Sequence, residues 1–286
     1  ADAQPLALAE RGAAVIWTCH VGADQPNACT RAAWDFLRPY LERARAYVFS
    51  SAEYAWEGLR PDRVVVIPPC LDAFSPKNQT LSDGEVAAIL NRCGLIPDGG
   101  RTAPTFVRQN GSTGVVSERA RVFQESELAP DSTMVTQVSR WDPLKDHVGV
   151  MRAFTDHVPA DLMGHLVLAG PSPESVADDP EGWTTFEELV ARWEDLAPPA
   201  RSRVHIACLP MEDGEENAAV VNALQRRSDV IVQKSLAEGF GLTVAEAMWK
   251  ARPTIGSRVG GIQDQIEHGR SGLLVDDSED LAAAVG

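Results

Sequence analysis

Two carboxylates bracket a glycine-containing turn that opens a predicted helix: Glu238 and Glu246, in Glu238-Gly-Phe-Gly-Leu-Thr-Val-Ala-Glu246. An apolar strand, residues 229–233, comes just before, so the order is strand, glycine loop and helix N-terminus. In α/β folds this order marks where phosphorylated ligands bind, because the first N–H groups of the helix face the anion. Gly239 and Gly241 let the backbone approach that anion closely. Since a carboxylate would repel phosphate, we expect the glutamates to accept hydrogen bonds from sugar or ribose hydroxyls.

A second loop carries two cations at the end of another predicted strand. Arg140 and Lys145 lie in Ser139-Arg-Trp-Asp-Pro-Leu-Lys-Asp146, directly after residues 134–138. Arginine supplies a rigid fork and lysine a point charge, and together they can hold a diphosphate. The alternative is a surface loop in which Arg140 pairs with Asp142 or Asp146. Two phosphate-compatible loops at the strand ends of one sheet favour a binding site.

Three other segments lie at predicted strand ends and have ordinary structural explanations as well. They are His20 after the strand ending at Cys19, the acidic turn at 178–183, and the glycine turn at 259–262. The six histidines show no metal-binding spacing, and no nucleophile elbow, Walker A loop or G-x-G-x-x-G appears. Hydrolase, NTPase and dehydrogenase functions therefore lose support.

Strand-like and helix-like segments alternate along the chain, which predicts an α/β protein with parallel sheets covered on both faces. The predicted strands are 15–19, 46–50, 64–68, 134–138, 165–169, 204–208, 230–233, 254–256 and 272–275. The predicted helices are 30–45, 148–157, 184–196, 217–227 and 242–250. Residues 97–132 are rich in Pro, Gly, Ser and Thr and are expected to form an interdomain connection or a long surface excursion. We therefore expect one domain over 1–130, including the connecting segment, and a second over 131–286.

Composition narrows the partners and the compartment. The 286 residues are 44% apolar and carry a net charge of −15, with a pI near 4.8. Nucleic acid and anionic membranes would be repelled overall, and no apolar run is long enough to span a bilayer. The five scattered cysteines fit reduced thiols in a cytoplasmic protein. The chain begins in a loop and stops within a predicted helix at 280–286, so we expect a fragment that lacks both ends.

Several motifs together resemble the trehalose glycosyltransferring synthases, which are retaining, nucleotide-sugar-dependent enzymes of the GT-B fold. The resemblance rests on residues 139–146, Asp178-Asp-Pro-Glu-Gly-Trp183, Val221-Asn-Ala-Leu-Gln-Arg226, residues 238–249, Trp17-Thr-Cys-His20, Pro68-Pro-Cys-Leu-Asp72 and Ser75-Pro-Lys-Asn78. The glutamate pair marks the broader retaining GT-B group, whereas the Asp-Asp-Pro-Glu-Gly-Trp piece looks more specific to the trehalose branch. The resemblance implies two Rossmann-like domains, the N-terminal one incomplete.

The resemblance also implies roles for individual residues. Arg140 and Lys145 would bind the diphosphate, Glu238 the donor glucose and Glu246 the ribose. The rest of the donor site would be formed by Gly239, Phe240, Gly241, Leu242 and Thr243. On the acceptor side, His20 is a candidate, and Asp2 and Gln4 match a His-Asp-Pro-Gln motif, although Ala1 and Ala3 replace its His and Pro.

The implied reaction moves glucose from a nucleoside-diphosphate glucose to free glucose, with retention, giving trehalose. No tightly bound cofactor and no protein metal site are expected, and any Mg²⁺ would accompany the nucleotide. A related transferase with another acceptor, a trehalose phosphorylase, and a non-catalytic nucleotide-binding fragment remain open. So do the base of the donor and the oligomeric state, including a homodimer.

Overall fold

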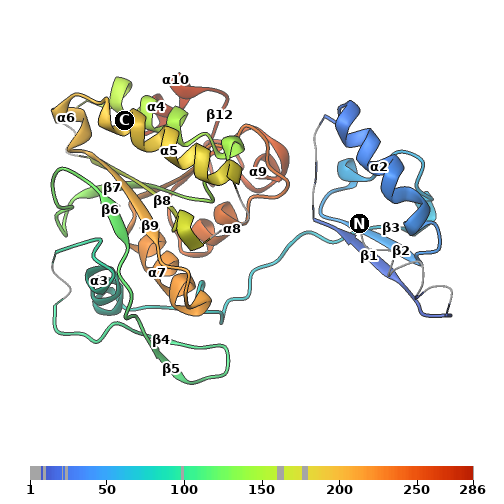
Figure 1. Cartoon of the computed structure of the whole chain (residues 1–286), viewed down its shortest axis with the longest axis horizontal. Coiled ribbons are helices and arrows are strands. Elements are labelled where there is room, and N and C mark those ends of the chain that lie inside the picture. Colours follow the sequence, from blue (N-terminus) through green and yellow to red (C-terminus); the bar gives the residue numbers. More distant parts are fainter. Residues whose placement is uncertain are drawn as a thin grey trace. The chain divides into compact units, whose positions relative to one another are not determined.

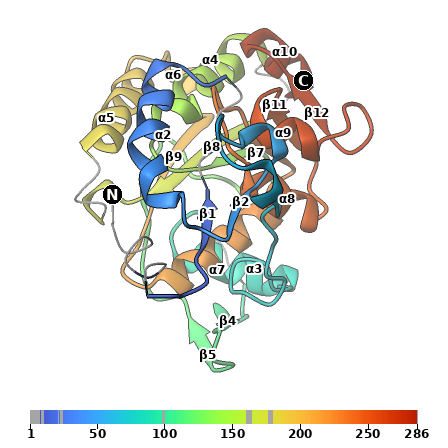
Figure 2. The same cartoon turned by 90° about the vertical axis from the view of Figure 1, so that its right-hand side faces the viewer.

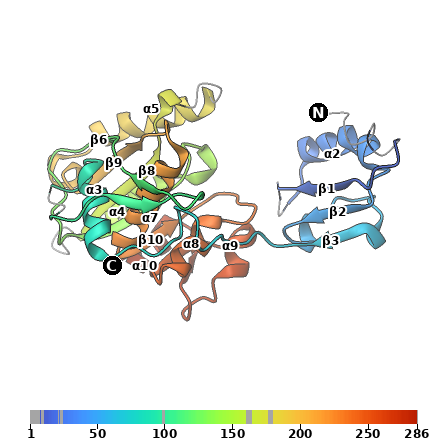
Figure 3. The same cartoon turned by 90° about the horizontal axis from the view of Figure 1, so that it is seen from below.

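A computed structural model describes most of the chain as two compact units, drawn in Figures 1 to 3. The described residues are Leu8, 11–20, Gly22, 25–97, 100–159, 164–175 and 180–285. The first unit comprises Ala1–Cys70, Ala237–Gly241 and Val259–Asp264, and the second comprises Leu71–Leu236, Leu242–Arg258 and Gln265–Gly286.

The first unit contains a parallel three-stranded sheet with a helix, and its elements follow the predicted order. The strands β1 (Ile16–Cys19), β2 (Ala46–Phe49) and β3 (Val64–Val66) lie in the order β1-β2-β3. Helix α2 (Ala28–Leu41) begins where the Asn27 side chain accepts a hydrogen bond from the Thr30 N–H, at 2.9 Å. Its apolar face packs into an aromatic core formed by Trp34, Tyr47, Phe49, Tyr54 and Trp56.

The second unit is built on a seven-stranded sheet in the order β12-β11-β10-β7-β8-β9-β6. Its strands are β6 (Arg121–Phe123), β7 (Thr133–Val138), β8 (Gly164–Pro171), β9 (Val204–Leu209), β10 (Val230–Gln233), β11 (Thr254–Ser257) and β12 (Leu273–Val275). All neighbours are parallel except β6, which runs antiparallel to β9 at the edge. The parallel α/β sheet expected from residue 134 onward is confirmed.

Helices cover both faces of this sheet (Figure 1). They are α3 (Asp83–Arg92), α4 (His147–His157), α5 (Pro180–Glu194), α6 (Pro198–Arg201), α7 (Gly214–Arg227), α8 (Leu242–Trp249) and α10 (Ser278–Val285). Successive strand residues alternate between faces, so Met134 joins the core under α3 and α7 whereas Val135 joins the core under α4 and α5. Because both faces are buried, the strands are mostly apolar, which is how they could be recognised in the sequence, although β7 also carries Thr136 and Gln137.

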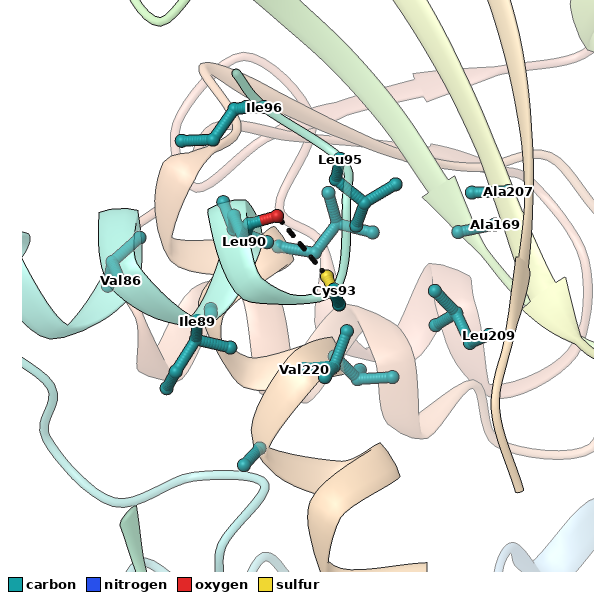
Figure 4. Packing of buried hydrophobic residues seen from close by; sticks show 14 of the residues in the cluster. Val86, Ile89, Leu90, Cys93, Leu95, Ile96, Ala169, Ala207, Leu209 and Val220 are labelled. Atoms are coloured by element: carbon teal, nitrogen blue, oxygen red, sulfur yellow. Dashed lines mark hydrogen bonds between the residues drawn. The ribbon is translucent and has the colours of Figure 1, made fainter. Parts of the chain in front are cut away.

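Helix α3 was not predicted from the sequence, although it has a start signal. The Ser82 hydroxyl accepts from the Glu85 N–H at 3.3 Å, and the Glu85 carboxylate accepts from the Ser82 N–H at 2.8 Å, which completes a capping box. Figure 4 shows the end of the helix, where Cys93 lies among apolar side chains from α3, α7 and the sheet. Burial raises the pKa of the Cys93 thiol to about 12, so it packs as a neutral side chain.

Residues 97–132 belong to the second unit instead of connecting the two units, and most of the described ones are exposed at its surface, as a surface excursion would be. They contain the hairpin β4 (Thr105–Val107) and β5 (Thr113–Val115), followed by the edge strand β6. Phe106 and Leu128 from this segment are buried in the core with α3 and α7. The strands have only three residues each, which is too short for an alternating pattern to be visible in the sequence.

Carboxylates at the start of α7 hold this segment in place. Glu216 is buried and accepts from the N–H groups of Ser117 and Glu118, both at 2.7 Å. Arg108 pairs with Asp213 at 2.6 Å and with Glu215 at 2.9 Å. Residues 71–130, assigned to the first domain by composition, thus pack within the second unit, and the contact boundary follows Cys70. Whether residue 130 separates two independently folding domains stays a prediction.

A histidine pair, in which His205 is buried and His165 half-buried, makes the stability of the second unit sensitive to acid. His165 Nδ1 lies 2.9 Å from His205 Nε2, and His205 Nδ1 lies 3.2 Å from Gln124 Oε1. Burial lowers the pKa of His205 to about 4 and also lowers the pKa of His165, so both rings are neutral in the folded protein at pH 7. The unfolded chain takes up these protons near pH 6.5.

Proton uptake by the unfolded chain at His205 therefore lowers the free energy of unfolding. This loss is absent above pH 6.5 and grows to about 3 kcal/mol as the pH falls towards 4. We expect urea unfolding of His205→Leu to show a shallower decline between pH 6.5 and 4 than the wild type. His157→Leu, which changes an exposed histidine, serves as the control and should keep the wild-type slope. Equal slopes for wild type and His205→Leu would contradict the assignment.

Candidate functional site

The two loops predicted to bind a ligand follow neighbouring strands of the second sheet. Strand β7 ends at Val138 and leads into Ser139–Lys145, whereas β10 ends at Gln233 and leads towards Glu238. The two strands are parallel and directly paired, so the segments that follow them leave the sheet side by side, at the C-terminal ends of the strands. Ligands of open α/β sheets bind at this end.

Buried polar side chains join these loops to one another. Gln137 donates to the carbonyl oxygen of Lys145 at 2.8 Å and accepts from the Lys234 N–H at 3.3 Å. The N–H of Leu236 donates to the Leu144 carbonyl oxygen at 2.8 Å. The Gln137 amide is fully buried and forms hydrogen bonds with both loops. It therefore fixes their spacing, because breaking either bond would leave a buried polar group unpaired.

Asp146 and Lys234 form a further link between the same loops. Asp146 has a φ of 47°, a left-handed conformation uncommon outside glycine, and its carboxylate caps α4 by accepting from the Gly149 N–H at 3.1 Å. The ammonium of Lys234, which is almost fully buried, pairs with the same carboxylate. No sequence pattern indicates Lys234, because its partner lies far away along the chain.

Arg140 and Lys145 lie on the loop after β7, as expected. The Arg140 side chain is 70% exposed, and its guanidinium lies 3.3 Å from the Asp142 carboxylate, which is the pairing left open by the sequence. A surface ion pair of this kind contributes little stability, so the guanidinium can exchange Asp142 for a stronger anion. Lys145 is half-buried in the short 3₁₀ turn Pro143–Lys145.

His147, the first residue of α4, has a structural role beside this loop; from the sequence it was noted only that the histidines lack metal-binding spacing. Its Nε2 lies 2.9 Å from the Ser139 hydroxyl, and its ring packs 5.0 Å from Trp141. Burial, with the Lys145 charge nearby, lowers its pKa to about 3. A neutral ring therefore tethers the start of the cationic loop to α4. Trp141 in turn donates to the Pro171 carbonyl oxygen at 2.6 Å.

Two glycine turns lie against one another in the first unit. The N–H of Gly261 donates to the Gly239 carbonyl oxygen at 3.1 Å. Gly241 has a φ of 84° and Gly260 a φ of 48°. A Cβ on Gly260 would overlap the Glu238 carbonyl oxygen, so glycine is required there. Residues 259–262, predicted as a turn, instead begin the short helix α9 (Gly260–Gln265).

The remaining predicted donor-site residues lie in or next to α8. Leu242 is exposed and Thr243 half-buried in its first turn, and Glu238 and Phe240 are half-buried in the preceding loop. Glu246, one turn further, is buried, with a side-chain exposure of 4%. Its Oε1 lies 2.7 Å from the Lys77 ammonium, and its Oε2 accepts from the Gln225 amide at 3.1 Å.

Of the acceptor-side candidates, His20 lies within the described residues. His20 is exposed just after β1. Asp2 and Gln4, like residues 178–179 of the acidic turn, lie outside the described residues.

Neither a metal cluster nor a membrane span is found in the described part of the chain. Within the described residues, no group of three or more His, Cys, Asp or Glu side chains is arranged to hold a metal ion. No helix in the same part of the chain is long and apolar enough to cross a membrane.

Comparison with known families gives matches along most of the chain. The model described as "Glycosyl transferases group 1" matches residues 133–286, and the one described as "Trehalose synthase, N-terminal domain" matches residues 1–56.

Individual relatives agree with these matches. A trehalose synthase of Thermococcus litoralis is 35% identical over 98% of this chain and 57% of the relative, so the chain spans little more than half its length. A trehalose phosphorylase of Grifola frondosa is 29% identical over 54% of this chain and 21% of the relative. Among solved structures, Anabaena HepE in complex with UDP and glucose matches with a TM-score of 0.68 and 16% identity, over 98% of this chain and 63% of HepE.

Proposed function

The chain belongs to the group 1 glycosyl transferases and has the GT-B fold, and on that premise we propose that it forms trehalose by moving glucose from a nucleoside-diphosphate glucose to glucose. The observation that carries the proposal is the parallel pairing of β7 and β10, because the cationic loop after β7 and the segment that follows β10 then leave the sheet at the same end. Similarity to trehalose synthases over nearly the whole chain supports the choice of product. The complex of Anabaena HepE with UDP and glucose supports a nucleotide-sugar donor.

Each predicted residue then has a chemical task. Arg140 and Lys145 bind the diphosphate as charged donors. The backbone N–H groups of residues 239–242 face its oxygens, since Gly239 and Gly241 leave no side chain in the way. Glu238 accepts from hydroxyls of the donor glucose and Glu246 from the ribose.

Catalysis follows from the charge that develops as the glycosidic bond breaks. Negative charge grows on the leaving diphosphate, and the cations on the loop after β7 stabilise that change more than the ground state. We assign retention of configuration without a protein nucleophile: the leaving phosphate oxygen takes the proton of the incoming glucose hydroxyl. No metal is required in this scheme, and any Mg²⁺ arrives with the nucleotide.

The second candidate is phosphorolysis of trehalose, which is favoured by the similarity to the Grifola frondosa phosphorylase over about half of the chain. Inorganic phosphate would then occupy the place of the diphosphate and no nucleoside would be needed. Glucose-dependent release of nucleoside diphosphate supports the synthase, whereas phosphate-dependent breakdown of trehalose supports the phosphorylase.

Calorimetric titration of UDP and ADP tests the donor site directly. We expect at least one of them to bind, and both Arg140→Ala and Glu246→Gln to weaken that binding about tenfold, or about 1.4 kcal/mol, through loss of one charged contact each. Arg60→Ala removes an exposed cation paired with Asp62 in the first unit and should bind as the wild type does. A folded chain that binds neither nucleotide would contradict the proposal.

A further inference from the structure

Lysine is scarce in this protein, and its few copies are not spread over the surface. Only four of the 26 Lys and Arg residues are lysines: Lys77, Lys145, Lys234 and Lys250. All four lie in the second unit, Lys145 and Lys234 on the two joined loops and Lys77 and Lys250 beside α8. A lysine ammonium is a compact point charge, whereas arginine is a planar fork, so the two are not equivalent at a crowded contact.

Lys77 belongs to a segment that buried side chains hold firmly against α7 and α8. We call residues 75–79 the strap. Asn222 donates to the carbonyl oxygens of Pro76 and Gln79, at 3.0 and 2.9 Å. The Trp249 indole donates to the Asn78 carbonyl oxygen at 3.0 Å. The strap backbone is therefore fixed on both sides of Lys77.

A second anchor of the strap is the buried ammonium of Lys250. It donates to the Asn78 side-chain oxygen at 3.1 Å and lies 3.4 Å from the Glu246 carbonyl oxygen. Burial, opposed by the nearby Glu246 charge, lowers the pKa of Lys250 to about 7. Asn78 is thus held through its backbone and its side chain. The position of the Cα atom of the neighbouring Lys77 is therefore fixed as well.

The Lys77 side chain reaches the carboxylate of Glu246 from this fixed base. The ion pair is 2.7 Å long, and the lysine end is 40% exposed whereas the carboxylate end is 4% exposed. Gln225 binds the other carboxylate oxygen from the buried side. Burial removes water from this carboxylate, and Lys77 and Gln225 replace the water with an ion pair and a hydrogen bond.

The remaining hydrogen-bonding capacity of Glu246 matches what a ribose offers. An ionised carboxylate has about four lone-pair sites. Lys77 and Gln225 occupy one on each oxygen, which leaves about two for a pair of neighbouring hydroxyls. With both oxygens held, the plane of the carboxylate is set before a ligand arrives, and preorganisation of this kind lowers the entropic cost of binding.

We propose that Lys77 is a positioning residue for the donor nucleoside: its ammonium orients Glu246 so that the carboxylate accepts both ribose hydroxyls. This inference rests on the proposed function, since it specifies how the ribose end of the donor site is built. Lys77 itself does not contact the nucleotide.

The test compares UDP with 2′,3′-dideoxy-UDP, in wild type and in Lys77→Met, by calorimetry. The wild type should bind UDP at least tenfold more tightly than the dideoxy compound, because two hydrogen bonds to a carboxylate are lost with the hydroxyls. In Lys77→Met, UDP affinity should fall about tenfold while dideoxy-UDP affinity stays unchanged, so the preference for ribose is largely lost. A merely structural role for Lys77 would weaken both nucleotides alike.

Two further variants keep the outcome clear. Lys77→Arg, which retains the charge, should recover part of the ribose preference and serves as the test if Lys77→Met does not fold. Arg270→Met removes an exposed cation paired with Glu267 and should leave both affinities unchanged.

The two proposals fail in different ways. A wild type that prefers ribose while both Lys77 variants keep the full preference overturns the role of Lys77 alone. Tighter UDP binding by Lys77→Met also overturns it, because the ammonium would then compete with the ribose. A wild type that binds neither UDP nor ADP overturns this inference together with the proposed function; if only ADP binds, the same comparison is made with ADP and 2′,3′-dideoxy-ADP.

Discussion

Replacing Arg140 and Lys145 together by alanine is expected to lower the rate of glucose transfer about a thousandfold, which corresponds to about 4 kcal/mol of lost transition-state stabilisation. Both residues lie on the loop whose backbone is held by Gln137, so the base of each side chain is placed before the diphosphate leaves. Charge grows on that group only as the bond breaks, and the loss should therefore fall mainly on kcat. The measurement is glucose-dependent release of nucleoside diphosphate.

The structure offers controls for this double substitution. Arg270→Ala removes an exposed cation from the same unit and should change the rate less than twofold. Arg140 pairs only weakly with Asp142 at the surface, so Arg140→Ala alone should leave the melting temperature unchanged. If the double variant kept more than a tenth of the wild-type rate, these cations would not be the groups that stabilise the leaving diphosphate.

The parallel sheet of the second unit was predictable because its strands obey a local rule. Strands covered on both faces are mostly apolar, and the predicted ranges from residue 134 onward match β7 to β12 within a few residues. The same rule fails for β4, β5 and β6, which are three residues long and lie in a Pro- and Gly-rich stretch. Their place in the fold depends on carboxylates of α7 about a hundred residues away.

In the candidate site, too, some features are visible along the sequence, whereas others depend on contacts between residues far apart in it. Strand ends, glycines and cations could be read along the chain, and the structure places Arg140, Lys145 and Glu246 in the expected elements. The side chains that hold them could not be found in this way. Gln137 joins loops nearly a hundred residues apart, and the strap brings Lys77 to Glu246 across 169 positions. Such contacts leave no pattern in a single sequence.

Alanine at Gly260 is expected to destabilise the protein by about 3 kcal/mol and to weaken UDP binding about tenfold. Two costs combine, because Gly260 has a left-handed φ of 48° and its added Cβ would overlap the Glu238 carbonyl oxygen. The Glu238 carbonyl oxygen is a backbone atom and cannot move aside by a change of rotamer, so the main chain itself must shift. The displaced segment includes Gly239, whose carbonyl oxygen accepts from the Gly261 N–H, and the shift therefore reaches the N–H groups assigned to the diphosphate.

Gly269 separates the two causes. It too has a positive φ, 77°, but a Cβ there would meet nothing within 4 Å. Gly269→Ala should consequently cost only the backbone strain, about 1 kcal/mol, and leave the affinity for UDP unchanged. Urea unfolding gives the stability of each variant and calorimetry the affinity. Equal losses in the two variants would mean that φ alone matters, and that the close packing of Gly260 on Glu238 does not shape the glycine turn.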